Sequence, residues 1–597
     1  MVSCTDLEKA IQSLILSPSG WRAVFAHGGS DAGESTSPDI AVAHRIIITR
    51  AARVFAEYLH THLTRPVVVV GMDTRPTGPA IADQLIGGLL DAGCGVEFAG
   101  IVAAPEIMAY ARSGDVNGFV YISASHNPIG HNGLKFGLDD GGVLPAPEAK
   151  KLIAAFLANK DYDDGAVPRH NKERITAVLN KQGEYKRSVY QAYLAFSREV
   201  SQGDKTGGDI LAAISADLKV RPLGIAVDFN GSARTVSIDR EFFESLGISL
   251  HAINDKPGAI AHRIVPEGES LEPCCRYLEK LHATDSSIIL GYVPDCDGDR
   301  GNLVIWDQGE QRVRSLEAQE VFALACVGEL AQLVWSGVDM AKVAIVVNDP
   351  TSMRVDQIAK AFGASVFHAE VGEAHVVGLA RHLRERGYIA RILGEGSAGG
   401  NITHPSAVRD PIHTVMAIVK LLCVRGTGDK AGLFEIWRNR VGKAYQEDFS
   451  LLDIIATLPT FYTTGSYTPD AVLQVKSADH AALKERYQTV FLWEWEVRKA
   501  GLAARYGITQ WEVFCYNGIE EKRGLSRFGE AGRGGLKLMF SDVAGNEVAW
   551  IWMRGSGTEP VFRVMADAYS AELERELIQW QRDMVIEADG NEISGGA

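Results

Sequence analysis

The stretch Val67-Val68-Val69-Val70-Gly71-Met72-Asp73 decides the fold class of this chain. Its consecutive β-branched residues indicate a strand that is buried on both faces, and an acidic residue follows the strand. The next segment, 80–92, has the apolar spacing of a helix. The same order, an apolar run and then an acidic or amide residue, returns at 224–230 and 343–349. The sequence therefore predicts repeated α/β units with mainly parallel strand pairing.

The chain has 597 residues, which is enough for several domains of ordinary size. Segments 160–184 and 201–208 are rich in charge, Gly and Asp, and we interpret them as a linker or insertion. A further boundary is expected near 308–314. Region 449–535 matches no unit that we can assign, and we expect its aromatic residues to belong to a core rather than to a sugar-stacking surface.

Charge and composition narrow the classes of partner. Lys+Arg total 60 and Asp+Glu total 75, so the formal net charge is −15, which argues against nucleic acid or an anionic membrane as a partner. The 8 cysteines form no C-x-x-C pair, which indicates a reducing compartment. The first residues match neither a signal peptide nor a membrane span. We expect a cytoplasmic protein that is a monomer or a homodimer.

A serine-containing loop follows the apolar run 118–122. It reads Ser123-Ala124-Ser125-His126-Asn127-Pro128, so Ser125 is expected at the carboxyl end of a strand, where open α/β sheets place their ligands. A serine in that position can carry a phosphoryl group as a covalent intermediate. The alternative is a polar turn in which Ser125 and Asn127 satisfy backbone groups.

An acidic loop, Asp295-Cys296-Asp297-Gly298-Asp299-Arg300, follows a second apolar run at 288–293. Carboxylates held together repel one another by roughly 4 kcal/mol per pair at 4 Å and an effective dielectric of 20, and a divalent cation removes that cost. Mg²⁺ suits all-oxygen ligands. An EF-hand is excluded because its last position falls on Trp306 instead of glutamate. A solvated acidic turn remains the alternative.

Two further loops are suited to a phosphorylated sugar. Near the C-terminus, Arg554-Gly555-Ser556-Gly557-Thr558-Glu559-Pro560 and Arg563 offer backbone N–H groups, hydroxyls and a guanidinium to an anion. An ordinary Gly-Ser turn is the alternative. Between the acidic loop and this one, 394–401 offers Glu395 and Ser397, which suit hydrogen bonds to sugar hydroxyls.

The four loops, in this order, resemble those of the α-D-phosphohexomutases, which include phosphoglucomutases, phosphomannomutases and phosphoglucosamine mutases. The resemblance implies four domains around a central cleft. Three are related α/β domains with mixed, mainly parallel sheets, and the fourth is a smaller α+β C-terminal domain. The implied boundaries are 1–205, 206–312, 313–445 and 446–597, the last with an unassigned insertion.

The resemblance also implies roles for individual residues. Ser125 corresponds to the phosphorylated nucleophile, and it shares one Mg²⁺ with Asp295, Asp297 and Asp299. The residues implied to lie close to the transferring group are Arg22, His126 and Lys135. Those implied to bind the sugar or its second phosphate are Glu395, Ser397, His404, Arg409, Arg554, Ser556, Gly557, Thr558 and Arg563.

The predicted activity is interconversion of hexose 1-phosphate and hexose 6-phosphate through a phosphoserine enzyme and a hexose 1,6-bisphosphate, which also acts as activator. Such a reaction asks for positioning, a metal and cations around the transferred group. At Gly396 and Gly399 this sequence departs from the sugar loop that is common in the family. The histidine of the common loop is absent here, and His404 could replace it. Glucose is the expected sugar, mannose the next, and glucosamine an alternative. A phosphoserine phosphatase and a catalytically silent sugar-phosphate binding protein are the other hypotheses.

Overall fold

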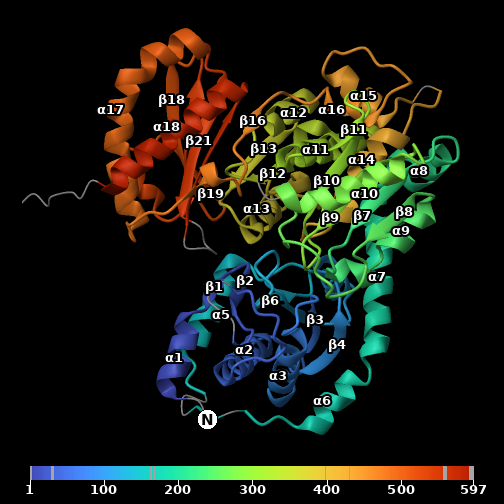
Figure 1. Cartoon of the computed structure of the whole chain (residues 1–597), viewed down its shortest axis with the longest axis vertical. Coiled ribbons are helices and arrows are strands. Elements are labelled where there is room, and N and C mark those ends of the chain that lie inside the picture. The colour runs from blue at the N-terminus through green and yellow to red at the C-terminus, as the bar shows by residue number, and fades with distance from the viewer. Residues whose placement is uncertain are drawn as a thin grey trace, which may run out of the picture. The chain divides into compact units, whose positions relative to one another are not determined.

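The computed structural model describes residues 3–28, 33–161, 165–166, 168–396, 399–428, 430–555 and 561–590 (Figure 1). The chain forms two compact units. The first unit comprises Met1–Leu316, Trp335–Gly337 and Gly400–Glu435, and the second comprises Glu317–Val334, Val338–Gly399 and Ile436–Ala597. Within the described ranges, no helix has both the length and the apolar character that crossing a bilayer requires.

The first sheet of the first unit has the strand order β1-β2-β6-β5-β3-β4. Its strands are β1 (Ile15–Ser17), β2 (Gly20–Val24), β3 (Val67–Met72), β4 (Gly95–Ile101), β5 (Gly118–Ile122) and β6 (His131–Leu138). The helices of this part are α1 (Cys4–Gln12), α2 (Val42–His60), α3 (Gly78–Asp91), α4 (Ala104–Ala111), α5 (Ala146–Ala158), α6 (Lys172–Leu179) and α7 (Gln182–Gln202). As predicted, β3 is a buried strand, with only its first residue, Val67, partly exposed, and it pairs in parallel with β4 and β5. The outer pairs, β5 with β6 and β6 with β2, are antiparallel.

The second sheet repeats this plan in the order β11-β10-β9-β7-β8. Its strands are β7 (Gly224–Asp228), β8 (Ser249–Ile253), β9 (Ile288–Pro294), β10 (Gly301–Asp307) and β11 (Arg312–Ser315). Its helices are α8 (Ile210–Leu218), α9 (Asp239–Leu246) and α10 (Glu272–His282), and α14 (Pro411–Cys423) also belongs to the first unit. Here β7 pairs in parallel with β8 and β9, and β9 pairs antiparallel with β10. Because β5–β6 and β9–β10 are equivalent hairpins, their connecting loops occupy equivalent places in the two sheets.

The second unit contains a third parallel group in which β12 (Val343–Asn348) lies between β13 (Ser365–Ala369) and β14 (Ile389–Gly394). Its helices are α11 (Ala318–Trp335), α12 (Arg354–Phe362) and α13 (Glu373–Glu385). The short β15 (Ile402–Thr403) follows, and then α15 (Leu433–Arg440) and α16 (Leu451–Ile455). The three-fold recurrence confirms the predicted multi-domain α/β class with mixed sheets.

The C-terminal sheet is antiparallel and has the order β16-β22-β21-β20-β18-β19, with β17 beside β22. Its strands are β16 (Tyr462–Thr463), β17 (Val472–Leu473), β18 (Gln510–Asn517), β19 (Glu520–Arg523), β20 (Gly535–Ser541), β21 (Glu547–Gly555) and β22 (Phe562–Ala568). The helices α17 (His480–Tyr506) and α18 (Ala571–Gly590) pack on one face, as Figure 1 shows. The aromatic segment 491–495 lies in α17, where Phe491 and Trp495 are core residues and Trp493 is exposed.

Two segments that the sequence analysis placed at boundaries have regular structure. Segment 160–184, interpreted as a linker or insertion, contains α6 and the start of α7, and segment 308–314 contains the turn of the β10–β11 hairpin and most of β11. Helix α7 is rich in charged residues because one face is solvated, while Val189, Tyr193 and Leu194 are buried. The predicted four-domain boundaries remain a prediction.

Candidate active site

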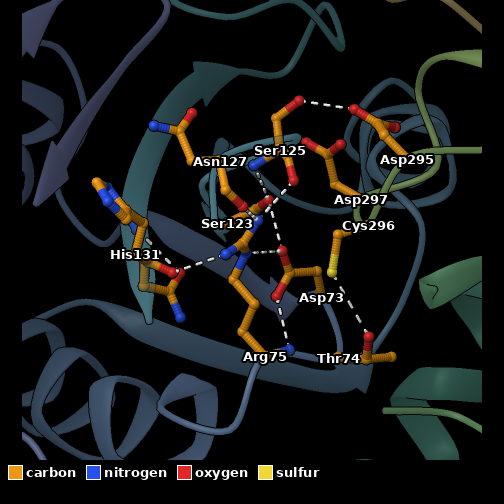
Figure 2. A network of polar contacts seen from close by, with 12 residues as sticks. Asp73, Thr74, Arg75, Ser123, Ser125, Asn127, His131, Asp295, Cys296 and Asp297 are labelled. Atoms are coloured by element: carbon orange, nitrogen blue, oxygen red, sulfur yellow. Dashed lines mark hydrogen bonds and ion pairs between the residues drawn. The ribbon is translucent and has the colours of Figure 1, made fainter. Parts of the chain in front are cut away.

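Ser125 lies in the loop between β5 and β6. Its φ of 54° falls in the left-handed region that residues with a side chain rarely adopt, so the loop holds it in a strained conformation. The side chain is buried, and Oγ donates a hydrogen bond to Asp295 Oδ2 at 2.7 Å (Figure 2). The serine hydroxyl and the acidic loop, 170 positions apart at this contact, therefore meet.

Two buried residues at the end of β3 hold the serine loop in place. Ser123 Oγ donates to Asp73 Oδ2 at 2.7 Å and accepts from the Ser125 backbone N–H at 2.8 Å. The Arg75 guanidinium donates to the carbonyl oxygens of Ser125 and Asn127, each at 2.6 Å, and its Nε donates to Asp73 Oδ2 at 3.1 Å. Figure 2 shows Arg75 beneath the loop. One guanidinium thus fixes the backbone on both sides of His126.

The acidic loop gathers Asp295, Asp297 and Asp299 between β9 and β10. One carboxylate oxygen from each of the three lies within 4.8 Å of the other two, and all three residues are buried. The turn requires Gly298, whose φ is 70° and whose added Cβ would lie 2.4 Å from Arg234 Cδ. Cys296 points away from the carboxylates, toward Thr74 Oγ1 at 3.6 Å, so it is a spacer in this loop (Figure 2).

Cationic side chains surround these carboxylates. Lys135 Nζ lies 2.7 Å from Asp297 Oδ2 and 3.3 Å from Asp299 Oδ2. A guanidinium nitrogen of Arg409 lies 3.4 Å from Asp299 Oδ1. Arg22, on β2, is also buried, and its Nε has no hydrogen-bond partner among the described residues. A buried donor of this kind is suited to an oxyanion.

A second cluster lies wholly within the second unit, around Glu370. Arg554 Nε and a terminal nitrogen donate to Glu370 Oε1 at 3.1 and 2.8 Å. Two residues later, the Gly372 N–H donates to Glu395 Oε1 at 2.7 Å. Arg563 stands opposite Arg554 in the β21–β22 register. The segment from Glu370 to Gly372 therefore joins the predicted phosphate-binding arginine to the predicted sugar-binding glutamate.

Comparisons with known proteins decide the family. Residues 42–163 match the family model described as phosphoglucomutase/phosphomannomutase, alpha/beta/alpha domain I, and residues 324–439 match the model for domain III. A phosphoglucomutase/phosphomannomutase of Thermococcus kodakarensis is 25% identical over 531 residues, which cover 88% of this chain and 91% of the relative. The chain belongs to the α-D-phosphohexomutase family. It is accordingly an enzyme of the isomerase class.

Two further comparisons show how this phosphohexomutase relates to others. A phosphoglucosamine mutase of Clostridium botulinum is 30% identical over 251 residues, which cover 41% of this chain and 49% of that relative. A solved phosphoglucomutase/phosphomannomutase family protein of Burkholderia thailandensis has a TM-score of 0.60 at 17% identity, covering 97% of this chain and 98% of its own. The latter shows a shared fold.

The acidic loop of this phosphohexomutase fits a hard divalent cation. All three candidate ligands are carboxylates, and Asp297 Oδ1 is buried with no hydrogen-bond partner among the described residues. Burial, and then the charges of Asp297 and Asp299, raise the pKa of Asp295 well above its usual range. A bound cation would relieve that repulsion, and Mg²⁺ matches this set of ligands.

Burial and positive neighbours also set the ionisation of other groups here. Burial, followed by the charges of Arg300, Arg22 and Arg409, holds the pKa of His126 well below its usual range, so its imidazole is neutral near pH 7. Burial opposes ionisation of Asp299, but Arg409 and Lys135 outweigh it and depress the pKa of that carboxyl. The site therefore combines a neutral imidazole with a permanently ionised carboxylate.

The predicted residues fall into two groups. The first unit brings together Ser125, the acidic loop, Lys135, Arg22, His126 and Arg409, and it also contains His404. The second unit contains Glu395, Arg554 and Arg563. Four predicted residues lie outside the described part of the chain: Ser397, Ser556, Gly557 and Thr558.

Sequence reasoning missed the residues that hold these groups in position. Arg75 lies within the motif Gly71-Met72-Asp73-Thr74-Arg75-Pro76, so an acid and a base two positions apart after a buried strand could have indicated it. Glu370 and Arg234 carry no such signal. Their partners, Arg554 and Gly298, are distant in the sequence.

Proposed function

We propose that this enzyme interconverts hexose 1-phosphate and hexose 6-phosphate, with glucose as the first substrate and mannose as the next. The observation that carries the proposal is the 2.7 Å hydrogen bond from Ser125 Oγ to Asp295, within a buried set of three carboxylates. A serine hydroxyl beside a candidate Mg²⁺ site is an arrangement suited to phosphoryl transfer through a phosphoserine, and this supports the proposal.

In the proposed reaction, the bond between Ser125 Oγ and phosphorus breaks as a bond forms between a hexose hydroxyl oxygen and the same phosphorus. The hydroxyl proton leaves to a base, and a hexose 1,6-bisphosphate results. The bisphosphate then reverses its orientation in the site. Ser125 Oγ forms a bond to the phosphorus of the other phosphoryl group, the bond from that phosphorus to the sugar oxygen breaks, and the sugar oxygen takes the proton back from the base. Asp295, Asp297 and Asp299 would hold Mg²⁺, which would neutralise charge on the transferred group.

The protein's own cations would stabilise the charge that spreads over the transferred group. Arg22 offers a buried Nε that has no acceptor within the described chain, and Lys135 and Arg409 carry further positive charge. Burial and neighbouring arginines hold the pKa of His126 well below its usual range, so the imidazole beside Ser125 is neutral near pH 7 and adds no charge to this set of cations.

The second unit would bind the rest of the substrate. Arg554 would hold the phosphate that is not being transferred, together with Ser556, Gly557, Thr558 and Arg563. Glu395 and Ser397 would accept and donate hydrogen bonds at sugar hydroxyls, and His404 would take the place of the missing loop histidine. Glu370 would orient Arg554, since it already binds two of its nitrogens.

A phosphoglucosamine mutase is the second candidate. It is favoured by the 30% identity over 251 residues to the clostridial enzyme of that name. The two candidates share the serine, the acidic loop and the phosphate-binding arginine, so they differ only in how the sugar is recognised. Rates measured side by side with the 1-phosphates of glucose, mannose and glucosamine would rank them.

The Ser125→Ala variant tests the proposal. We expect kcat to fall at least about 10³-fold, because the covalent route is lost, and phosphoserine to disappear from the peptide that contains position 125. Ser188→Ala, which removes a hydroxyl exposed on α7, is the matched control and should leave both unchanged. Full activity in Ser125→Ala would remove this serine from the mechanism. Release of inorganic phosphate in step with substrate loss would indicate a phosphatase, and binding without turnover would indicate a silent protein.

A further inference from the structure

The C-terminal sheet buries a lysine on a largely apolar face. Along β20, Leu536, Leu538 and Phe540 point toward the core that α17 and α18 cover. Lys537 alternates with them and shares the opposite face with Met539 of its own strand, and with Trp550 and Trp552 of β21. Lys537 is only 1% exposed. A buried ammonium on such a face needs a partner.

A cavity of about 420 Å³ adjoins this face, wholly within the second unit. It lies between the sheet strands β18 to β21 and the elements α12, β13 and α13, and we call it the Lys537 cavity. Polar groups in its lining include those of Lys537, Trp550, Asp356 and His368. The volume falls in the range of small-molecule sites, roughly 300–1,000 Å³.

Two donors in the lining lack acceptors. Lys537 Nζ lies 5.0 Å from the Trp550 ring centroid and 5.6 Å from that of Tyr516. The charges of Asp349, Asp356, Asp567 and Glu521 also act on it, but no residue that the structure describes forms a hydrogen bond or ion pair with it. Trp550 is 0% exposed, and its Nε1 has no hydrogen-bond partner within the same residues. Ammonium and indole N–H groups can only donate. Although Asp356, Glu521 and Glu547 also line the cavity, neither of these two donors is hydrogen-bonded to an acceptor in the described part of the chain.

The neighbouring carboxyl groups do not meet this need by direct contact. Burial raises the pKa of Asp356 to about 7, so this carboxyl is partly protonated at neutral pH. Asp349 Oδ2 accepts from Trp552 Nε1 at 2.5 Å, and Glu521 Oε1 accepts from Arg523 Nε at 2.7 Å. Burial keeps His368 neutral by lowering its pKa well below the usual range. Asp349 Oδ1 is buried without a partner among the described residues, but Asp349 does not line the cavity. Burial lowers the pKa of Lys537, and the charges of Asp349 and Asp356 oppose that shift. The two unsatisfied groups that line the cavity, Lys537 Nζ and Trp550 Nε1, are thus both donors.

We propose that the Lys537 cavity is a binding site for a small oxyanion, the phosphate or carboxylate group of a metabolite, which accepts hydrogen bonds from Lys537 Nζ and Trp550 Nε1. The site is distinct from Ser125 and the acidic loop. It is also distinct from the predicted phosphate loop after Arg554. The inference goes beyond the mutase proposal and stands independently of it, because none of its residues has a role in the proposed reaction.

Thermal unfolding of the full chain tests the site. Tm is measured at pH 7 and constant ionic strength, with chloride replaced by phosphate in one series and by malonate in another. Comparing the two series shows whether the site prefers a phosphate or a carboxylate group. We expect a favoured anion to raise Tm by roughly 3 °C in the wild type at saturation. Lys537→Met should lose most of this rise, whereas Lys522→Met, which removes an exposed lysine on β19 at the end of the same sheet, should retain it. Equal rises in all three proteins would overturn the proposal.

Crystallography separates this site from anion binding elsewhere. Crystals of the full chain soaked in selenate should show an anomalous peak within hydrogen-bond distance of Lys537 Nζ, and the peak should be absent from Lys537→Met. Water alone in the cavity at saturating selenate, malonate and phosphate would overturn the proposal. Trp550→Phe keeps the ring and the lysine but removes the N–H, so anion affinity should fall about tenfold. This variant decides the question if Lys537→Met does not fold, and unchanged affinity would contradict the proposal.

Discussion

Lys135 places its ammonium between two carboxylates of the acidic loop, Asp297 and Asp299. The lysine is buried on β6, so its charge is poorly screened by solvent. It therefore neutralises the loop in the absence of another cation, and it would compete with a metal for the same oxygens. At the scale of the residue, this predicts that one side chain both supports phosphoryl transfer and weakens metal binding.

Lys135→Met tests this dual role. We expect Mg²⁺ affinity, measured by calorimetry, to rise about tenfold because a competing positive charge is gone. We expect kcat to fall at least about 10²-fold because a charge near the transferred group is also gone. Lys151→Met, an exposed lysine paired with Glu148 on α5, should change neither quantity. Mg²⁺ affinity that falls or stays constant would show that Lys135 does not compete for the carboxylates.

At the scale of the element, the acidic loop is held by the short 3-10 helix η2 (Ala233–Val236). The Ala233 N–H donates to the Cys296 carbonyl oxygen at 3.0 Å, and Arg234 donates to the Gly298 carbonyl oxygen at 3.3 Å. Arg234 also donates to the Tyr193 hydroxyl at 2.9 Å, which in turn donates to Asp410 Oδ2 at 2.6 Å. Helix α7 and the start of α14 are thereby tied to the loop, and Arg409 is held beside it.

Tyr193→Phe should destabilise the first unit. The substitution leaves a guanidinium N–H and a carboxylate oxygen buried without their shared partner, which costs about 1–3 kcal/mol of unfolding free energy. Urea unfolding measures this loss. Tyr190→Phe, one turn earlier on α7, removes a hydroxyl that bonds Glu241 at the surface, and its effect should stay within about 0.5 kcal/mol. Equal effects from the two variants would show that the buried network contributes little.

At the scale of the whole molecule, buried carboxyl groups link the stability of the second unit to pH. Burial raises the pKa of Asp567 to about 6, although hydrogen bonds from Thr463, Met353 N–H and Ser352 oppose the shift. At pH values between the ordinary aspartate pKa of 3.8 and about 6, the folded state therefore keeps a proton on Asp567 that the unfolded state has lost. The stability contributed by this proton is full below that window, falls as pH rises through it and is lost above about pH 6.

Asp567→Asn tests the linkage. The amide cannot ionise, so the free energy of unfolding should depend less on pH between 4 and 7. Summed over that range, the pH-dependent change in the free energy of unfolding should be smaller than in the wild type by at most about 3 kcal/mol. Urea titrations followed by tryptophan fluorescence at several pH values measure this slope. Asp583→Asn, an exposed carboxylate on α18, should keep the wild-type slope. An unchanged slope in Asp567→Asn would place the titrating group elsewhere.

The class of fold and the positions of the reactive loops can be read from the amino-acid sequence alone. The β-branched runs at 67–73, 224–230 and 343–349 became β3, β7 and β12, because a strand buried on both faces admits almost only apolar residues. The loops that follow β5 and β9 were also predicted where they lie. Patterns of this kind are local, so a single segment is enough to show them.

Which side chains hold those loops, and which of the loops meet, becomes visible only once the chain is folded. Arg75 binds the backbone around Ser125, and Tyr193 reaches Asp410 across 217 positions. In the sequence, Lys537 is a single lysine within an apolar run, and only the folded structure shows that it lines a cavity. These contacts depend on the packing of elements far apart in the chain, and hydrophobic periodicity carries no information about which buried polar groups become partners.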